Sequence, residues 1–168
     1  MKIVIQLLFS ISFIVLFSMS CSKSSNAPEQ TTDLQTIKVN LQYGFADELN
    51  TFTQMYQKDL VADGTVTVPF WLTSAEQEVI LRKVQEVGFF SFPDTIHKQS
   101  GVLLSPDPSP DLLRVKTDNL DKTVVWSYPL DPNDTQSRLI LELRDVITQV
   151  VQAKSEYKGL PAARGARL

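Results

Sequence analysis

Residues 135–155 read TQSRLILELRDVITQVVQAKS, and their apolar side chains recur every three or four positions. This spacing predicts a helix with a continuous apolar stripe, made of Leu139, Ile140, Leu143, Val146, Ile147, Val150 and Val151. Asp134 is a suitable N-cap for it. Burying the stripe contributes about 14 kcal/mol at about 2 kcal/mol per residue. Ordering the backbone costs at least about 1 kcal/mol per residue, so the helix needs a sheet face to lie on.

Residues 36–43 provide the clearest strand of that sheet. Ile37, Val39, Leu41 and Tyr43 alternate with polar residues, which predicts a strand with one wet face. We expect a polar turn over residues 44–50 to follow it.

Two hairpins are predicted next to this strand. One joins residues 52–61 to 65–72 around Asp63-Gly64, because glycine tolerates the positive φ of a tight turn. Pro69 cannot donate a ladder hydrogen bond, so the second arm should have an open edge. The other hairpin joins residues 111–117 to 122–128 around Asp118-Asn119.

A shorter helix is predicted over residues 75–87. Thr73 with Glu76, or Ser74 with Gln77, provides a capping box at its start, and Gly88 is a natural stop. Its apolar face consists of Ile80, Val84 and Val87, with Val79 beside it. Three aromatic residues follow: Phe89, Phe90 and Phe92. Large apolar side chains are more often found in a core than in a ligand site, so we expect them to pack under the end of the helix.

The order strand, hairpin, helix, hairpin, helix predicts an α+β two-layer sandwich. We expect a mainly antiparallel sheet of about five strands with two helices packed on one face. Residues 36–157 form the single domain of this prediction, and residues 158–168 form a C-terminal tail. The part after Leu160, with Arg164 and Arg167, is expected to fray in solvent. The alternative is that Tyr157 and Leu160 fold back onto the sheet.

The first 20 residues have the layout of a signal peptide. Lys2 precedes an apolar run over residues 3–17, and small residues at Ser18 and Ser20 favour cleavage after Ser20. Cys21 would then be the new N-terminus, and it is the sole cysteine of the chain, so no intramolecular disulfide can form. An uncleaved membrane anchor and a secreted protein with a free thiol are the alternatives, although the apolar run is short for a span of roughly 20 residues.

Residues 17–21, Phe-Ser-Met-Ser-Cys, resemble the lipobox of bacterial lipoproteins, although that motif prefers leucine where this chain has Ser18. The resemblance implies a diacylglyceryl group on the Cys21 sulfur, with acyl chains such as palmitate. A second chain of ten or more carbons adds on the order of 10 kcal/mol, so attachment would be permanent on a cellular timescale. The expected location is the cell envelope, outside the cytoplasm, facing the periplasm or on the cell surface.

Residues 21–35 contain the lipidated cysteine and a polar stretch that predicts a flexible tether with a reach of roughly 20 Å. Without Lys2 the mature chain has 15 basic and 19 acidic residues, a formal charge of −4. The basic residues are scattered and no basic block follows Cys21, which argues against nucleic acid and against anionic lipid headgroups as partners. The expected partners are the membrane, through the anchor, and an unknown protein or envelope ligand.

His97 is the only histidine, which excludes a metal site with two or more histidines and leaves it as the one histidine for a catalytic triad. No nucleophile motif accompanies it. It lies in the long segment 94–110, which is our first candidate binding loop and also holds Asp107, unless residues 102–104 form a short strand. Phe70 and Trp71, beside a possible sheet edge, are the second candidate, for a partner strand.

Two further stretches look like segments of small bacterial lipoproteins of unknown function. They run from Asn50-Thr51-Phe52 to Phe92-Pro93-Asp94 and over the tail from Glu156 to Pro161. Together with the helix between Thr73 and Gly88, which lies within the first stretch, this similarity covers most of the mature chain, and it implies no activity. The sequence predicts no catalytic set, metal site or cofactor. We expect a lipid-anchored, non-enzymatic binding or accessory domain; the alternatives are an envelope-acting hydrolase or a protein inhibitor of an extracellular enzyme.

Overall fold

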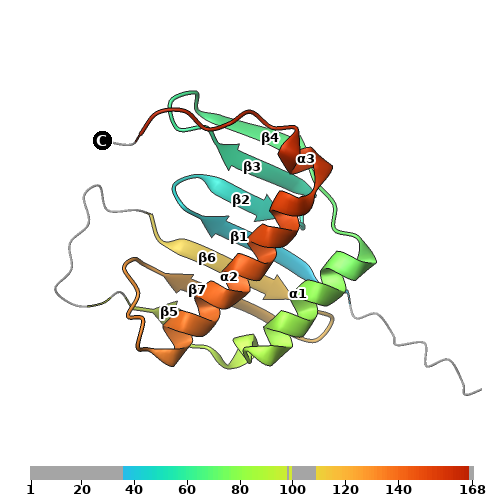
Figure 1. Ribbon diagram of the computed structural model, residues 1–168. Coiled ribbons are helices and arrows are strands. Elements are labelled where there is room, and N and C mark those ends of the chain that lie inside the picture. The colour runs from blue at the N-terminus through green and yellow to red at the C-terminus, as the bar shows by residue number, and fades with distance from the viewer. Residues whose placement is uncertain (1–35, 98, 100–108, 167–168) are drawn as a thin grey trace, which may run out of the picture. The chain divides into compact units, whose positions relative to one another are not determined.

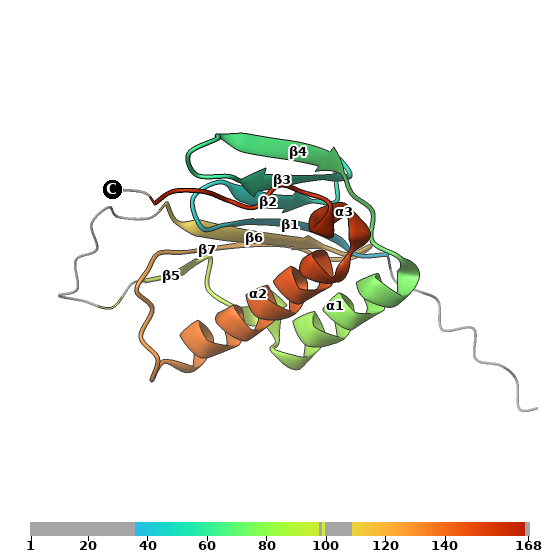
Figure 2. The same cartoon turned by 45° about the horizontal axis from the view of Figure 1, so that its top comes forward.

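A seven-stranded sheet forms one layer of the protein, and α1 and α2 lie side by side across one of its faces (Figures 1 and 2). This computed structural model describes residues 36–97, 99 and 109–166. The predicted signal peptide, Cys21, the tether to residue 35, Asp107 and the alternative strand at 102–104 lie outside the described residues.

The sheet has the strand order β4-β3-β2-β1-β6-β7-β5. Neighbouring strands are antiparallel except β5 and β7, which are parallel. The strands are β1 (Lys38–Tyr43), β2 (Asp47–Asn50), β3 (Met55–Asp59), β4 (Thr65–Pro69), β5 (Thr95–Ile96), β6 (Asp111–Lys116) and β7 (Asp121–Trp126). The helices are α1 (Ser74–Glu86), α2 (Thr135–Ala153) and the short α3 (Ser155–Lys158), with a 3-10 turn η1 (Phe89–Ser91) after α1.

The α+β class is therefore correct, but the expected number of strands is too small. The segment predicted as a polar turn, residues 44–50, contains β2. Leu49 is its only apolar residue, and it is buried opposite Leu41 of β1 and Tyr56 of β3. A two-residue strand such as β5 carries no periodic pattern, and it exists because the chain runs beside β7.

Local capping signals are confirmed at both long helices. At the start of α1 the Thr73 N–H donates to Glu76 Oε2 over 2.7 Å, and the Glu76 N–H donates to Thr73 Oγ1 over 3.3 Å. Gly88 ends this segment in the left-handed region with φ of 66°. At the start of α2 the Asp134 carboxylate accepts the Ser137 N–H at 2.7 Å.

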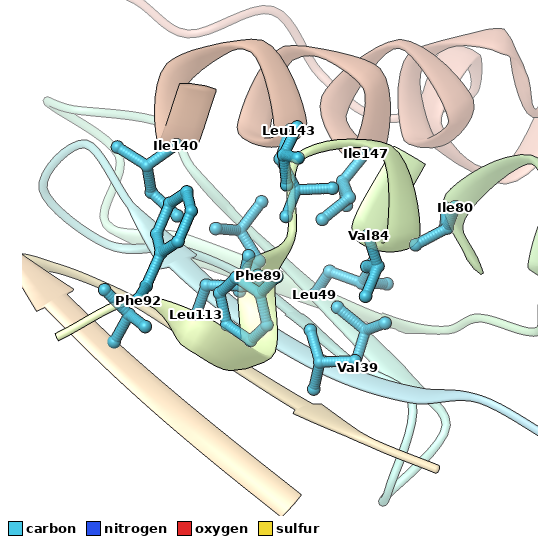
Figure 3. Packing of buried hydrophobic residues seen from close by; sticks show 14 of the residues in the cluster. Val39, Leu49, Ile80, Val84, Phe89, Phe92, Leu113, Ile140, Leu143 and Ile147 are labelled. Carbon is cyan, nitrogen blue, oxygen red and sulfur yellow. The ribbon is translucent and has the colours of Figure 1, made fainter. Parts of the chain in front are cut away.

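The core lies between the helices and the inner face of the sheet (Figure 3). Ile140, Leu143 and Ile147 of α2 are fully buried above the sheet, as the stripe predicts. Phe89 and Phe92 are also buried, which confirms their expected place under the end of α1. Hairpin β3–β4 turns at Gly64, with φ of 76°, and its arms are shorter than predicted. β4 is an edge strand that ends at Pro69.

The C-terminal segment is held against hairpin β3–β4, so the expectation that it frays after Leu160 is wrong as far as residue 164. The Tyr157 ring lies 5.7 Å from that of Tyr56, and Leu160 packs on the core, as the alternative predicted. Arg164 donates its N–H to Leu60 O over 3.2 Å and accepts the Ala62 N–H at 3.0 Å. Main-chain hydrogen bonds of this kind do not depend on side-chain type, so the sequence contains no pattern that predicts them. Arg167 lies outside the described residues.

Candidate functional site

The sheet has two ends that differ in chemistry, and we name them by strand β1. The near end is where β1 begins; it includes Thr36 and the turns 51–54, 70–73 and 117–120. The far end is where β1 finishes; it includes the turn 44–46 and the start of β6. A six-residue strand separates them by roughly 17 Å, at about 3.4 Å per residue.

An open cavity of about 350 Å³ lies at the far end, around the β1–β2 turn. Gly44, with φ of 65°, makes this tight turn possible. The described part of the lining is mostly polar and includes no lysine or arginine: Gln42, Tyr43, Gly44, Phe45, Ala46, Asp47, Glu48, Gln57, Ser109 and Pro110. A mixed lining of amides, carboxylates and a rim aromatic is typical of sites for small polar ligands.

Asp47 is the most constrained polar group of this lining. Its Oδ1 accepts hydrogen bonds from the Tyr56 hydroxyl at 3.2 Å and from the Asp59 N–H at 3.1 Å. Its Oδ2 would lie 3.6 Å from a Cβ at Gly44, and no described residue donates a hydrogen bond to it. Among the described residues, one oxygen is thus fixed by two hydrogen bonds and the other accepts none.

Other polar groups of the lining are also held in place. Gln57 donates its amide to Ala46 O over 2.9 Å, and Asn50 donates to Glu48 Oε1 over 3.0 Å. Burial raises the pKa of the Asp47 carboxyl above its ordinary value, against the opposing effect of its two hydrogen-bond donors. Among the described lining residues two are acidic and none is basic, which favours hydrogen-bond donors and positive charge.

A chain of tyrosine hydroxyls leads from Asp47 into the core. Because Tyr56 donates its proton to Asp47, its oxygen accepts from the Tyr43 hydroxyl, at 2.9 Å. Burial raises the pKa of Tyr43 to about 12 and also raises the pKa of Tyr56. Both hydroxyls therefore stay protonated in the folded protein well above neutral pH.

A second buried polar cluster lies next to the first, behind Gly44. The carboxylate of Asp111, which is 1% exposed, accepts the Gly44 N–H at 3.1 Å and the Tyr128 hydroxyl at 2.8 Å. Tyr128 in turn accepts hydrogen bonds from Trp126, at 3.3 Å, and from Arg144 of α2. Burial raises the pKa of Asp111 above its ordinary value. The turn that lines the cavity is thereby fixed to the core.

Sequence reasoning missed both clusters because their members lie far apart in the chain. Gly44 and Asp111, for example, are separated by 67 positions. Tyr43 and Tyr128 fit the apolar alternation of their strands, so nothing locally indicates that their hydroxyls meet partners. The one available signal is Asp111, an acidic residue at an inward position of strand β6, where Leu113 and Val115 are also buried.

His97 lies elsewhere, on a broad open cavity of about 700 Å³ that is also lined by Asp131, Asp134 and Ser137. Asp134 accepts the Ser137 N–H at the start of α2, and Asp131 accepts the Asn133 N–H at 2.8 Å. Ser137 is 2% exposed. His97 forms no hydrogen bond with any described residue, so this grouping of residue types is not arranged as a nucleophile, a base and an orienting carboxylate.

The structure places the two residues of the second candidate site, Phe70 and Trp71, in different environments. Phe70 is fully buried and packs against Tyr56, with ring centroids 5.7 Å apart, so it offers no surface to a partner. Trp71 is 52% exposed and lines a small cavity of about 180 Å³ at the near end.

Within the described ranges no group of three or more histidine, cysteine, aspartate or glutamate side chains is placed to hold a metal ion. The helices of the same ranges are too short or too polar to cross a membrane. No protein family, curated protein or solved structure matches the chain.

Proposed function

We propose that the chain is a membrane-anchored lipoprotein outside the cytoplasm, attached through Cys21, whose domain binds a small polar ligand and performs no chemistry on it. The anchor is supported by the sole cysteine of the chain, which directly follows an apolar run and the small residue Ser20. That run, over residues 3–17 with Lys2 before it, has the layout of an export signal.

The observation that carries the binding proposal is the second carboxylate oxygen of Asp47. Tyr56 and Asp59 hold Oδ1, so Oδ2 faces Gly44 in a fixed position at the cavity. Preorganised acceptors of this kind bind ligands without a further ordering cost. Together with Glu48 and the Gln42 amide, they favour a ligand that presents hydrogen-bond donors and a positive charge.

A suitable probe is glucosamine, which carries both hydroxyl groups and an ammonium group. We expect it to shift the backbone amide NMR signals of residues 44–48, and Asp47→Asn to abolish those shifts. Asp118→Asn is the matched control, because Asp118 is an exposed acidic residue at the near end. Shifts that are absent in the wild type, or that persist unchanged in Asp47→Asn, would reject this site.

The anchor is tested separately by fatty-acid labelling of cells that express the wild type or Cys21→Ala. The wild type should incorporate the label and the variant should not. Equal labelling of both would show that the acyl chains are not on this cysteine.

A further inference from the structure

The near end carries large apolar side chains from three different turns, two of them exposed and one half-buried. Trp71 is 52% exposed and Leu120 is 50% exposed, and both lie at this end. Phe52, whose side chain is half-buried, lies in the turn between β2 and β3. In the strand order of the sheet this turn stands between the turns that carry Trp71 and Leu120. Large exposed apolar groups that cluster on one surface mark contact with a partner or a membrane.

Two cavities of about 260 and 180 Å³ open at the same end, and they have Thr36 and Lys38 in common. The first contains Phe52 and Thr117, and the second contains Trp71. Thr36 is the first described residue, so the 35 residues that precede it join the domain here. An attachment of those residues to a membrane would therefore also keep this end of the sheet near that membrane.

Amines surround the apolar groups. Lys38 forms no ion pair with a described residue, and its Nζ lies 5.9 Å from the centre of the Phe52 ring. The Lys116 side chain is 49% exposed and lies 3.9 Å from Asp121, a loose contact. Among the described residues that line the two cavities, Asp118 is the only acidic one. Exposed tryptophan and leucine side chains bordered by lysines are suited to the headgroup layer of a bilayer. There the apolar side chains contact the acyl chains and the lysine ammonium groups contact lipid phosphates.

We infer that the near end is a bilayer-contacting surface, in which Trp71 and Leu120 enter the headgroup layer and Lys38 and Lys116 contact lipid phosphates. This inference rests on the proposed lipid anchor. A tether over residues 22–35 would hold the near end within roughly 20 Å of the lipid, so individually weak contacts form at high effective concentration. The domain then has a fixed orientation, and the far-end cavity faces away from the membrane.

The two tryptophans give a direct test, because Trp126 is fully buried while Trp71 is half exposed. Mature protein purified from cells that express the whole chain is mixed with vesicles of phosphatidylethanolamine and phosphatidylglycerol that contain lipids brominated near the headgroup. Bromine should quench the Trp71 fluorescence, and the lower polarity of the headgroup layer should shift its emission to shorter wavelength. Trp71→Phe should lose the quenching, since Trp126 lies in the core.

Leu120→Ser and the pair Lys38→Glu with Lys116→Glu should each weaken the quenching of Trp71. Phe45→Ser is the matched control, because Phe45 is 43% exposed but lies at the far end, and this variant should be quenched like the wild type. Vesicle flotation separates the two proposals. Protein that floats with an unquenched Trp71 overturns the contact surface and leaves the anchor standing, whereas protein that does not float removes the anchor and this inference with it.

Discussion

The Tyr56 hydroxyl lies 3.2 Å from Asp47 Oδ1 and donates a hydrogen bond to it. Tyr56 is a core residue at 1% exposure, whereas Asp47 lines the far-end cavity. The Tyr43 hydroxyl, 2.9 Å away, completes the chain. The orientation of the cavity carboxylate thus depends on the packing of Tyr56 against Phe70 and against Tyr157 of α3, so a substitution in this part of the core should alter the site.

Tyr56→Phe should lower the free energy of unfolding by about 1–3 kcal/mol, because it leaves the hydroxyl of the half-buried Tyr43 without its acceptor and Asp47 with one donor fewer. Urea unfolding at neutral pH measures this loss. Tyr43→Phe keeps the bond between Tyr56 and Asp47 and should cost less. The hydroxyl chain would have no energetic role if Tyr56→Phe were as stable as the wild type.

Alkaline pH should destabilise the fold through the same tyrosines. Burial raises the pKa of Tyr43 to about 12, whereas an unfolded tyrosine has a pKa of 10.0. The folded state therefore keeps a proton that the unfolded chain releases, so the free energy of unfolding falls as pH rises from 10 towards 12. Urea unfolding at several pH values above 9 gives the slope. Tyr43→Phe should have a shallower slope, and identical slopes would contradict the assignment.

Asp111 should show the corresponding effect at acidic pH. Burial raises the pKa of its carboxyl in the folded state, so the folded protein binds this proton more tightly than the unfolded chain. The resulting contribution is fully present below the ordinary pKa of 3.8 and is lost as pH rises through the raised pKa.

Asp111→Asn removes this titration while Asn can still accept the Gly44 N–H. Relative to the wild type, the variant should gain stability as pH rises from about 4 to 7. The measurement is the difference in urea midpoint between the two proteins across that range. A difference that stays constant with pH would show that Asp111 does not titrate abnormally.

Local signals in the sequence account for much of the fold. The alternation in β1, the Asp63-Gly64 turn, the Thr73 capping box and the stripe of α2 each depend on residues close together in the chain, and all were predictable. Strand β2 was not, because only Leu49 marks it and its burial depends on two neighbouring strands. The far-end cavity was equally hidden, since Asp47 acquires its role only when β3 brings Tyr56 beside it.

The C-terminal segment leads to the last prediction, which concerns Val61. This residue has φ of 64°, a left-handed conformation that is strained for a β-branched side chain. Its N–H donates to Asp59 Oδ1 over 2.9 Å, and the residues on either side of it pair with the main chain of Arg164. The conformation is therefore fixed by contacts on both sides, and the strain is balanced by the pairing of the C-terminal segment.

Val61→Gly should leave the free energy of unfolding within about 1 kcal/mol of the wild type. Relief of roughly 1–2 kcal/mol of left-handed strain offsets the entropy cost of glycine, about 0.5–1 kcal/mol, and the lost side-chain contacts. Val66 is the matched control, because it is a half-buried valine within β4, so Val66→Gly gains no strain relief and should cost more than about 1 kcal/mol. Urea unfolding of both variants decides the matter, since equal losses would mean that Val61 carries no strain and that Arg164 does not hold it in place.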